Sequence, residues 1–185
     1  MNKDVQRGQI DIGKIIADYY RKIYKLCLFY LNNDQQEAEE MVQEIFLKVM
    51  KKSKSFKGKS NIYTWIYRIA VNTLINYIKR KKIVEFISFE SIGDFKETAG
   101  YLNQSTIDPA EKLEKEETRE KEIRLLRECL TLLSGREKTA FYLFHYDNMK
   151  QKEIAEIMKT SVSAVESLVH KAMKKIKKRS GGEPF

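Results

Sequence analysis

Two short amphipathic segments joined by a tight turn, within residues 150–178, constrain the fold of this chain most. In the first segment, apolar residues occupy two adjacent rows of a helix: Ile154, Ala155, Ile157 and Met158. In the second, a single apolar stripe consists of Val162, Val165, Val169, Met173 and Ile176. Either Ser161 or Ser163 can cap this second helix. The pattern predicts a helix-turn-helix.

The outward face of the second helix predicts contact with duplex DNA. Small side chains near its start let the backbone approach the floor of the major groove, and lysines further along reach phosphates. The face consists of Ser163, Ala164, Ser167, His170, Lys171 and Lys174. From this segment alone, a surface helical hairpin with a solvated lysine face is an alternative.

Charge divides the chain into three blocks. Residues 1–82 carry 17 Lys and Arg against 8 Asp and Glu, residues 83–120 carry 4 against 10, and residues 121–179 carry 14 against 7. Two basic blocks are therefore separated by an acidic connector, a pattern expected when both ends meet a polyanion. The net charge of +9 favours DNA or RNA as the partner.

The chain contains 8 Gly and 2 Pro, and its apolar residues recur every three or four positions, so we expect an all-α fold. Helices are predicted over about 11–31, 35–52, 61–82 and 108–133, and from about 135 into the helix-turn-helix. Capping-box spacings, Asp34 with Glu37 and Ser134 with Glu137, mark two of their starts.

No helical period persists over residues 83–107, which are predicted to form a flexible acidic linker. Asp108 followed by Pro109 then marks a strong helix start. The expected organisation is a helical domain over 1–82, the linker over 83–107, a helix-turn-helix domain over 108–179 and a disordered tail over 180–185.

The sequence shows neither a membrane-spanning segment nor a secretory signal. No stretch approaches the roughly 20 apolar residues that cross a bilayer, and polar residues interrupt the N-terminus. We therefore expect a cytoplasmic protein without membrane insertion. Cys27 and Cys129 lie in helical apolar patterns, which is typical of small buried hydrophobes in a reducing compartment, so no metal or cofactor is expected.

The segment 51–80 combines a cationic loop with an aromatic helix. Aromatic rings and cations together suit single-stranded nucleic acid, because bases stack on the rings while cations follow the backbone. Inward positions of the helix are Ile62, Ile66, Ile69, Thr73 and Tyr77, and outward ones are Tyr63, Tyr67, Arg68, Asn72, Asn76 and Lys79. Alternatively, Tyr63, Trp65 and Tyr67 are simply part of the hydrophobic core.

An acidic, partly apolar stripe runs along the predicted helix over 35–52. Glu40, Gln43, Glu44 and Leu47 recur at helical spacing beside the apolar row. Because DNA repels such a face, it indicates a protein partner with a cationic surface. A solvated face, supported by Glu44 and Lys48 at i and i+4, is the alternative.

An enzymatic function is not expected. The only histidines, His145 and His170, have no partners at a recognised catalytic spacing, and the chain has no Gly-rich phosphate loop or metal-ligand cluster.

These segments, in this order, resemble the small two-domain sigma factors of bacterial RNA polymerase called the extracytoplasmic-function group. Residues 36–47 are similar to the family's polymerase-binding helix, and residues 56–72 to its promoter-melting loop and helix. Residues 132–178 are similar to its C-terminal domain. The resemblance covers roughly 14–82 and 122–178, and it implies a transcription-initiation factor, often one that serves a stress response.

The resemblance also implies roles for individual residues. The residues that would contact the clamp helices of the largest polymerase subunit are Glu40, Gln43, Glu44 and Leu47. Those capturing an unpaired base of the −10 element would be Phe56, Lys57, Lys59, Asn61, Arg68 and Asn72. Those contacting neighbouring phosphates would be Lys79, Arg80, Lys81 and Lys82. The −35 element would be read by Ser163, Ala164, Ser167, His170, Lys171 and Lys174.

Further partners also follow from the resemblance. It implies contact with the second-largest polymerase subunit, a linker near the RNA exit path and, as a candidate, an anti-sigma protein. Ser134 and Lys159 depart from the family, which often has Pro and Gly at these positions. Glu166 and Leu168 depart as well, which bears on the −35 preference. A rival interpretation is a dimeric helix-turn-helix regulator, which would need neither the acidic stripe nor the aromatic-cationic loop.

Overall fold

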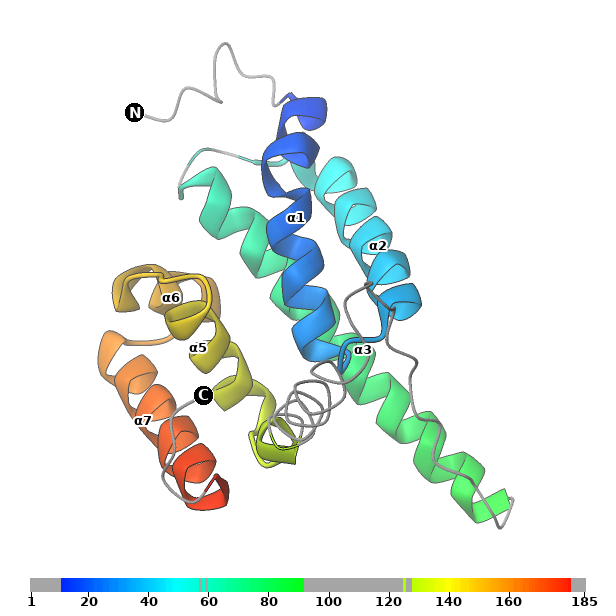
Figure 1. The fold of residues 1–185 in the computed structure, drawn as a ribbon. Coiled ribbons are helices and arrows are strands. Elements are labelled where there is room, and N and C mark those ends of the chain that lie inside the picture. The colour runs from blue at the N-terminus through cyan, green and yellow to red at the C-terminus, as the bar shows by residue number, and fades with distance from the viewer. Residues whose placement is uncertain (1–10, 57, 59, 92–124, 126–127, 181–185) are drawn as a thin grey trace, which may run out of the picture. The chain divides into compact units, whose positions relative to one another are not determined.

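The protein is all-helical in a computed structural model that describes residues 11–56, 58, 60–91, 125 and 128–180, with the backbone alone over 84–91. The helices are α1 (Ile12–Tyr30), α2 (Gln35–Ser53), α3 (Ile62–Ser91), α5 (Gly135–His145), α6 (Gln151–Met158) and α7 (Val162–Arg179). No residue of these ranges lies in a strand. The chain divides into two compact units, the first containing α1, α2 and α3 and the second containing α5 and α7, which confirms the predicted fold class (Figure 1).

Helices α1 and α2 form an antiparallel hairpin in the first unit (Figure 1). The connecting turn uses Asn32 and Asn33 at positive φ, a conformation that asparagine tolerates better than most residues. Asp34 then caps α2, its Oδ1 accepting a hydrogen bond of 2.9 Å from the Glu37 N–H. Asp11 caps α1 in the same way, with 3.1 Å to the Lys14 N–H. Local sequence therefore sets both helix starts.

Helix α3 is longer than predicted. It begins where Asn61 suggests, with the Asn61 Oδ1 accepting a hydrogen bond of 3.1 Å from the Tyr63 N–H. It continues past Lys82 to Ser91, so the helix end predicted at about Lys82 is wrong. The reason lies in the sequence, because residues 83–91 contain neither Gly nor Pro to stop a helix. The remaining linker, 92–107, lies outside the described residues, as do the helix start at Asp108 and the tail 181–185.

The hydrophobic core of the first unit is the shared interior of α1, α2 and α3. Helical periodicity predicts most of its members, which include Ile23, Leu26, Cys27, Met41, Val42, Ile45, Val49, Ile62, Ile66 and Leu74. Two predictions are wrong: Ile16, which the helical pattern places on the same inward stripe as Ile15 and Ile23, is 36% exposed, and Tyr67, expected on the outside, is fully buried. Both buried thiols, Cys27 and Cys129, are free, and burial raises the pKa of Cys27 to about 12.

In the second unit, α5 packs against α7, and both helix starts follow predicted caps. Ser134 and Glu137 form the full capping box, with the Ser134 hydroxyl accepting from the Glu137 N–H and the Glu137 carboxylate accepting from the Ser134 N–H. Helix α7 begins at Val162, which places Ser161 at its N-cap position. Val162 itself is 40% exposed rather than inward, because it starts the helix ahead of the buried row Val165, Val169, Ala172 and Ile176.

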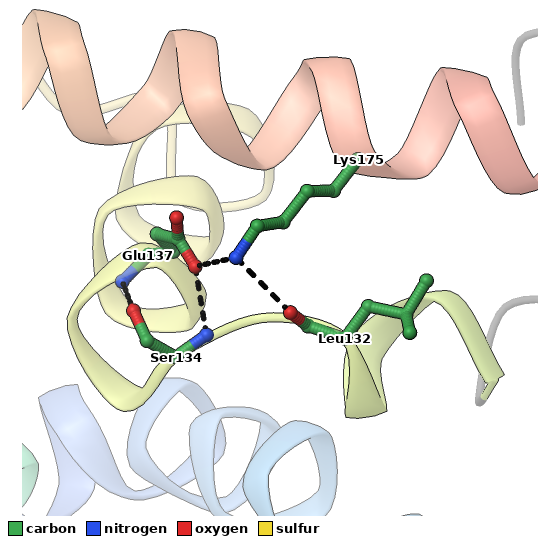
Figure 2. A network of polar contacts seen from close by, with 4 residues as sticks. All are labelled: Leu132, Ser134, Glu137 and Lys175. Atoms are coloured by element: carbon green, nitrogen blue, oxygen red, sulfur yellow. Dashed lines mark hydrogen bonds and ion pairs between the residues drawn. The ribbon is translucent and has the colours of Figure 1, made fainter.

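A polar network fixes the start of α5 to α7 (Figure 2). The Glu137 Oε2 accepts hydrogen bonds from the Ser134 N–H at 2.8 Å and from Lys175 Nζ at 2.7 Å. Lys175 Nζ also donates to the Leu132 carbonyl at 3.2 Å. Burial alone raises the pKa of Glu137, but hydrogen bonds from Lys175 and Ser134, together with the Lys175 charge, outweigh it and hold the pKa below its ordinary value.

The turn between α6 and α7 places Lys159 at φ 51°. This is the residue at which the sequence departs from the family's usual glycine, and it adopts the left-handed conformation that favours glycine. A residue with a Cβ is strained in this region by about 1 to 2 kcal/mol.

Replacing Lys159 with glycine should stabilise the protein. Relief of the strain outweighs the extra flexibility of the unfolded glycine chain, and we expect a gain of about 0.5 to 1 kcal/mol in the free energy of unfolding. Thermal denaturation followed by circular dichroism measures this gain. The same change at Lys171, within α7, should instead destabilise by about 1 kcal/mol. If both glycine substitutions lowered the free energy of unfolding, the turn at Lys159 would carry no strain.

Within the described residues, no helix combines the length and the apolar character needed to cross a membrane.

Candidate nucleic-acid and polymerase interfaces

The acidic stripe lies on the surface of α2. Glu40, Gln43 and Leu47 are exposed, with Leu47 at 50%, and Glu44 is half-buried. Beneath the stripe, Ile45 and Phe46 are buried, and Phe46 stacks with Tyr20 of α1 at 6.3 Å between ring centroids. The packed hairpin of α1 and α2 therefore presents the four predicted side chains along one helix.

Lys48 links this stripe to α3, a role that the sequence does not reveal. Its Nζ lies 2.5 Å from the Glu44 Oε1 and 3.4 Å from the Thr73 Oγ1. The first contact is the predicted i, i+4 pair, whereas the second joins residues that are far apart in sequence. Periodicity could identify Lys48 as a neighbour of Glu44 but not as a bridge between helices.

The loop before α3 is held by an aromatic contact. Phe56 packs on Trp65 with ring centroids 5.0 Å apart, and both residues are half-buried. Phe56, predicted to capture a base, thus anchors the loop as well. Gly58 adopts φ 66°, a conformation that favours glycine. Lys57 and Lys59, two other predicted members of this site, lie outside the described residues.

Three tyrosines and a lysine pack together between α1 and α3. Tyr63 lies 4.4 Å from Tyr67 and 5.8 Å from Tyr19, measured between ring centroids, and Lys22 Nζ lies 5.3 Å from the Tyr63 centroid. Tyr19, Tyr67 and Lys22 therefore all lie against the Tyr63 ring. The cluster is therefore interhelical packing: Tyr67 belongs to the core, as the alternative predicted, whereas Tyr63 is half-buried at its edge.

Polar and cationic side chains cover the outer side of α3. Asn61 is exposed at its start, Asn72 is exposed in its middle and Arg68 is half-buried between them. Further along, Lys79, Arg80 and Lys82 are exposed. Lys81 is exposed as well, but its Nζ is paired at 2.6 Å with the Glu37 Oε1 of α2. Glu37 thus turns its carboxylate toward α3 and not toward the Asp34 N–H, which donates to the Leu31 carbonyl instead. The capping box predicted for Asp34 and Glu37 is therefore only half formed, because the Asp34 side chain caps α2 but the Glu37 side chain does not reach back.

All six predicted −35 residues lie on α7. Ser163, Ser167, His170, Lys171 and Lys174 are exposed and Ala164 is half-buried, whereas the opposite side of the helix is buried. Lys175, which the sequence prediction left out of this face, is the residue engaged with Glu137. On α7, the lysine that pairs with Glu137 of α5 is therefore distinct from the lysines of the predicted DNA-binding face.

Comparison with known proteins agrees with this arrangement. The model of Sigma-70 region 2 matches residues 15–83, which contain α1, α2 and most of α3. The model of Sigma-70 region 4 matches residues 123–176, which contain α5, α6 and most of α7. The class defined by these two regions is that of the sigma-70 factors.

Relatives that align over most of this chain identify the group within this class. RNA polymerase sigma factor YlaC of Bacillus subtilis is 31% identical over 88% of this chain and 90% of its own length. ECF sigma factor SigW of the same organism is 30% identical over 96% and 93%, and the ECF sigma-E factor of Escherichia coli is 30% identical over 93% and 88%. The chain belongs to the extracytoplasmic-function group of RNA polymerase sigma factors, which confirms the resemblance.

Solved structures support the fold. The sigma factor RpoE of Bartonella quintana, in complex with the anti-sigma factor NepR, has a TM-score of 0.66 at 17% identity and covers 94% of this chain and 99% of its own. CnrH, in complex with the cytosolic domain of CnrY, has a TM-score of 0.61 at 16% identity and covers 94% and 89%.

Proposed function

We propose that this protein is a dissociable initiation subunit that binds core RNA polymerase, directs it to promoters with −35 and −10 elements, and helps to open the DNA. It acts in the cytoplasm and leaves RNA synthesis to the polymerase. The observation that carries the proposal is the division of surface within the first unit: α2 exposes carboxylates and a leucine, while α3 exposes amides and cations. A protein that binds only DNA has no use for the acidic stripe.

Each surface has a proposed ligand. The stripe Glu40, Gln43, Glu44 and Leu47 contacts the largest polymerase subunit, and the second-largest subunit is a further contact. The loop 56–61 with Arg68 and Asn72 holds an unpaired base of the −10 element, because an exposed amide and a guanidinium can pair with base edges. The outward face of α7 reads the −35 element in the major groove.

An anti-sigma protein is a further proposed partner. The structurally similar RpoE of Bartonella quintana forms a complex with the anti-sigma factor NepR. For this chain, co-purification of the tagged protein at natural abundance would test whether a stoichiometric inhibitor accompanies it.

Run-off transcription with purified core polymerase tests the main proposal, together with a gel shift of the isolated protein. We expect promoter-specific transcripts only when both the protein and the core enzyme are present. Tight, specific duplex binding by the isolated protein, with no transcription after core is added, would instead establish the dimeric regulator.

Asn72→Ala should lower open-complex formation while sparing polymerase binding. The exposed amide is lost without disturbing the buried side of α3, and we expect a roughly tenfold decrease, the size of one lost base contact. Permanganate footprinting measures opening, and fluorescence anisotropy measures core affinity. Gln35→Ala, an exposed amide at the start of α2, is the matched control and should change neither. Equal loss of opening and core affinity would show that Asn72 has a structural role.

A further inference from the structure

Helix α3 carries two different rows of polar side chains. Successive residues of a helix are rotated by about 100°, so residues three or four apart share a face. Asn72, Asn76, Lys79 and Lys82 follow this spacing, and all four are exposed. A second row on the other side is formed by Thr73, Tyr77 and Lys81. Four consecutive cations, 79–82, are thus divided between faces by helical geometry.

The second row faces α2. Thr73 is buried at 5% exposure and lies 3.4 Å from Lys48 Nζ. The Tyr77 hydroxyl donates a hydrogen bond of 2.5 Å to the Glu37 Oε1, and Lys81 Nζ lies 2.6 Å from the same oxygen. The hydrogen bond to Glu37, together with burial, raises the pKa of Tyr77 to about 12. Two donors therefore converge on one carboxylate and tie α3 to the start of α2.

A DNA phosphate would have to compete with Glu37 for Lys81. The Glu37 side chain is 15% exposed, whereas that of Lys81 is 48% exposed. Losing Lys81 would leave a largely buried carboxylate with one neutral donor, which is unfavourable. An exposed phosphate contact offers little in exchange, because water and salt already screen it. The pair with Glu37 should therefore persist when DNA binds.

We propose that the row Asn72, Asn76, Lys79 and Lys82 is the track on which α3 holds the opened −10 strand, and that Lys81 is a structural residue outside it. This inference rests on the proposed function. It adds Asn76 as a DNA contact and removes Lys81 from the phosphate contacts that the sequence predicted. Arg80, whose Nε lies 3.4 Å from the Asn76 carbonyl oxygen, flanks the row. The ligand is the sugar-phosphate backbone and base edges of single-stranded DNA.

The salt dependence of DNA binding distinguishes Lys81 from Lys82. Holoenzyme is bound to a fork DNA with a single-stranded −10 segment, and the logarithm of the binding constant is plotted against that of the salt concentration. Each phosphate contact contributes about 0.7 to the slope for a single strand. Lys82→Met should reduce the magnitude of the slope by about this amount, and Lys81→Met should leave it unchanged. An equal reduction by Lys81→Met would overturn the inference.

Thermal unfolding of the same variants supplies the complementary measurement. Lys81→Met should lower Tm because it leaves Glu37 without its cation, and Lys81→Arg should restore Tm. Lys82→Met should leave Tm unchanged. If Lys81→Met leaves both slope and Tm unchanged, the pair with Glu37 does not anchor α3, and the inference fails.

Asn76→Ala tests the added contact. Loss of one hydrogen bond from an uncharged amide should weaken fork binding about threefold to tenfold without changing the salt slope. Unchanged affinity would remove Asn76 from the track. Failure of the proposed function has a different signature: no variant of α3 would affect fork binding, and the protein would give no promoter-specific transcription with core polymerase.

Discussion

Glu44→Lys should weaken association with core RNA polymerase by about 30-fold or more. Glu44 lies on the exposed stripe of α2 beside Leu47, and the reversal places a second cation next to Lys48, which now lies 2.5 Å from the Glu44 carboxylate. Against a cationic partner surface, an attractive contact becomes a repulsive one, and such changes at the centre of an interface cost about 2 kcal/mol or more. Fluorescence anisotropy of labelled protein titrated with core polymerase measures the change.

Glu39→Lys provides a matched control. Glu39 is exposed on the same helix at the edge of the stripe, four positions before Gln43, so it undergoes the same charge change on a side of the helix that points away from Glu44. We expect its affinity for core polymerase to stay within about threefold of the original. The fold should survive both changes, because exposed ion pairs at i, i+4 contribute only about 0.3 to 0.5 kcal/mol. Equal weakening by both variants would indicate nonspecific attraction, and full affinity of Glu44→Lys would remove α2 from the interface.

Glu137→Ala should destabilise the second unit by about 2 to 3 kcal/mol. The Glu137 side chain is 8% exposed, and its loss removes the acceptor for both Lys175 Nζ and the Ser134 N–H. Half of the capping box disappears with it. Hydrogen exchange of the α5 and α7 amides measures the local free energy of opening. It should fall there and stay unchanged in α1 and α2.

Acidification should reproduce part of this loss. The folded pKa of Glu137 lies below its ordinary value of 4.5, so the carboxylate stabilises the native state above that pH. This contribution is lost as the pH falls through 4.5 and then through the folded pKa. The Glu137→Ala variant lacks this component of the pH dependence. Glu166→Ala, an exposed residue of α7, is the control and should retain it. Parallel pH profiles for wild type and Glu137→Ala would show that the network contributes no linkage.

Local sequence signals predicted the helix starts well. Asp34, Asn61 and Ser134 each cap a helix as their side chains suggest, because a cap depends on residues only two or three positions away. Periodicity predicted the buried rows of α2 and α7 for the same reason. It failed at Ile16, Tyr67 and Val162, which lie at the border of a helix face or at a helix end. At such positions a neighbouring helix decides burial.

The candidate interfaces likewise combine features that the sequence predicts with features that it does not. The exposed faces of α2 and α7 were predictable, because a helix must turn its polar residues away from the apolar row. The partner of each cation was not predictable. Four consecutive cations at 79–82 suggest a uniform phosphate-binding run, yet Lys81 pairs with Glu37, more than forty residues away in sequence. Likewise Lys175, one of several lysines in α7, is the one that reaches Glu137.

The sequence by itself determined that this chain is helical, where most of its helices begin, which rows are apolar and that it belongs to the sigma factors. These properties depend on spacings within one helix or on short motifs. Only the tertiary structure decided how far the cations of α3 and α7 are available to a ligand, because that depends on which carboxylate a neighbouring helix brings within hydrogen-bonding distance. Coulomb attraction acts through space, and spacing along one helix does not reveal charges contributed by another.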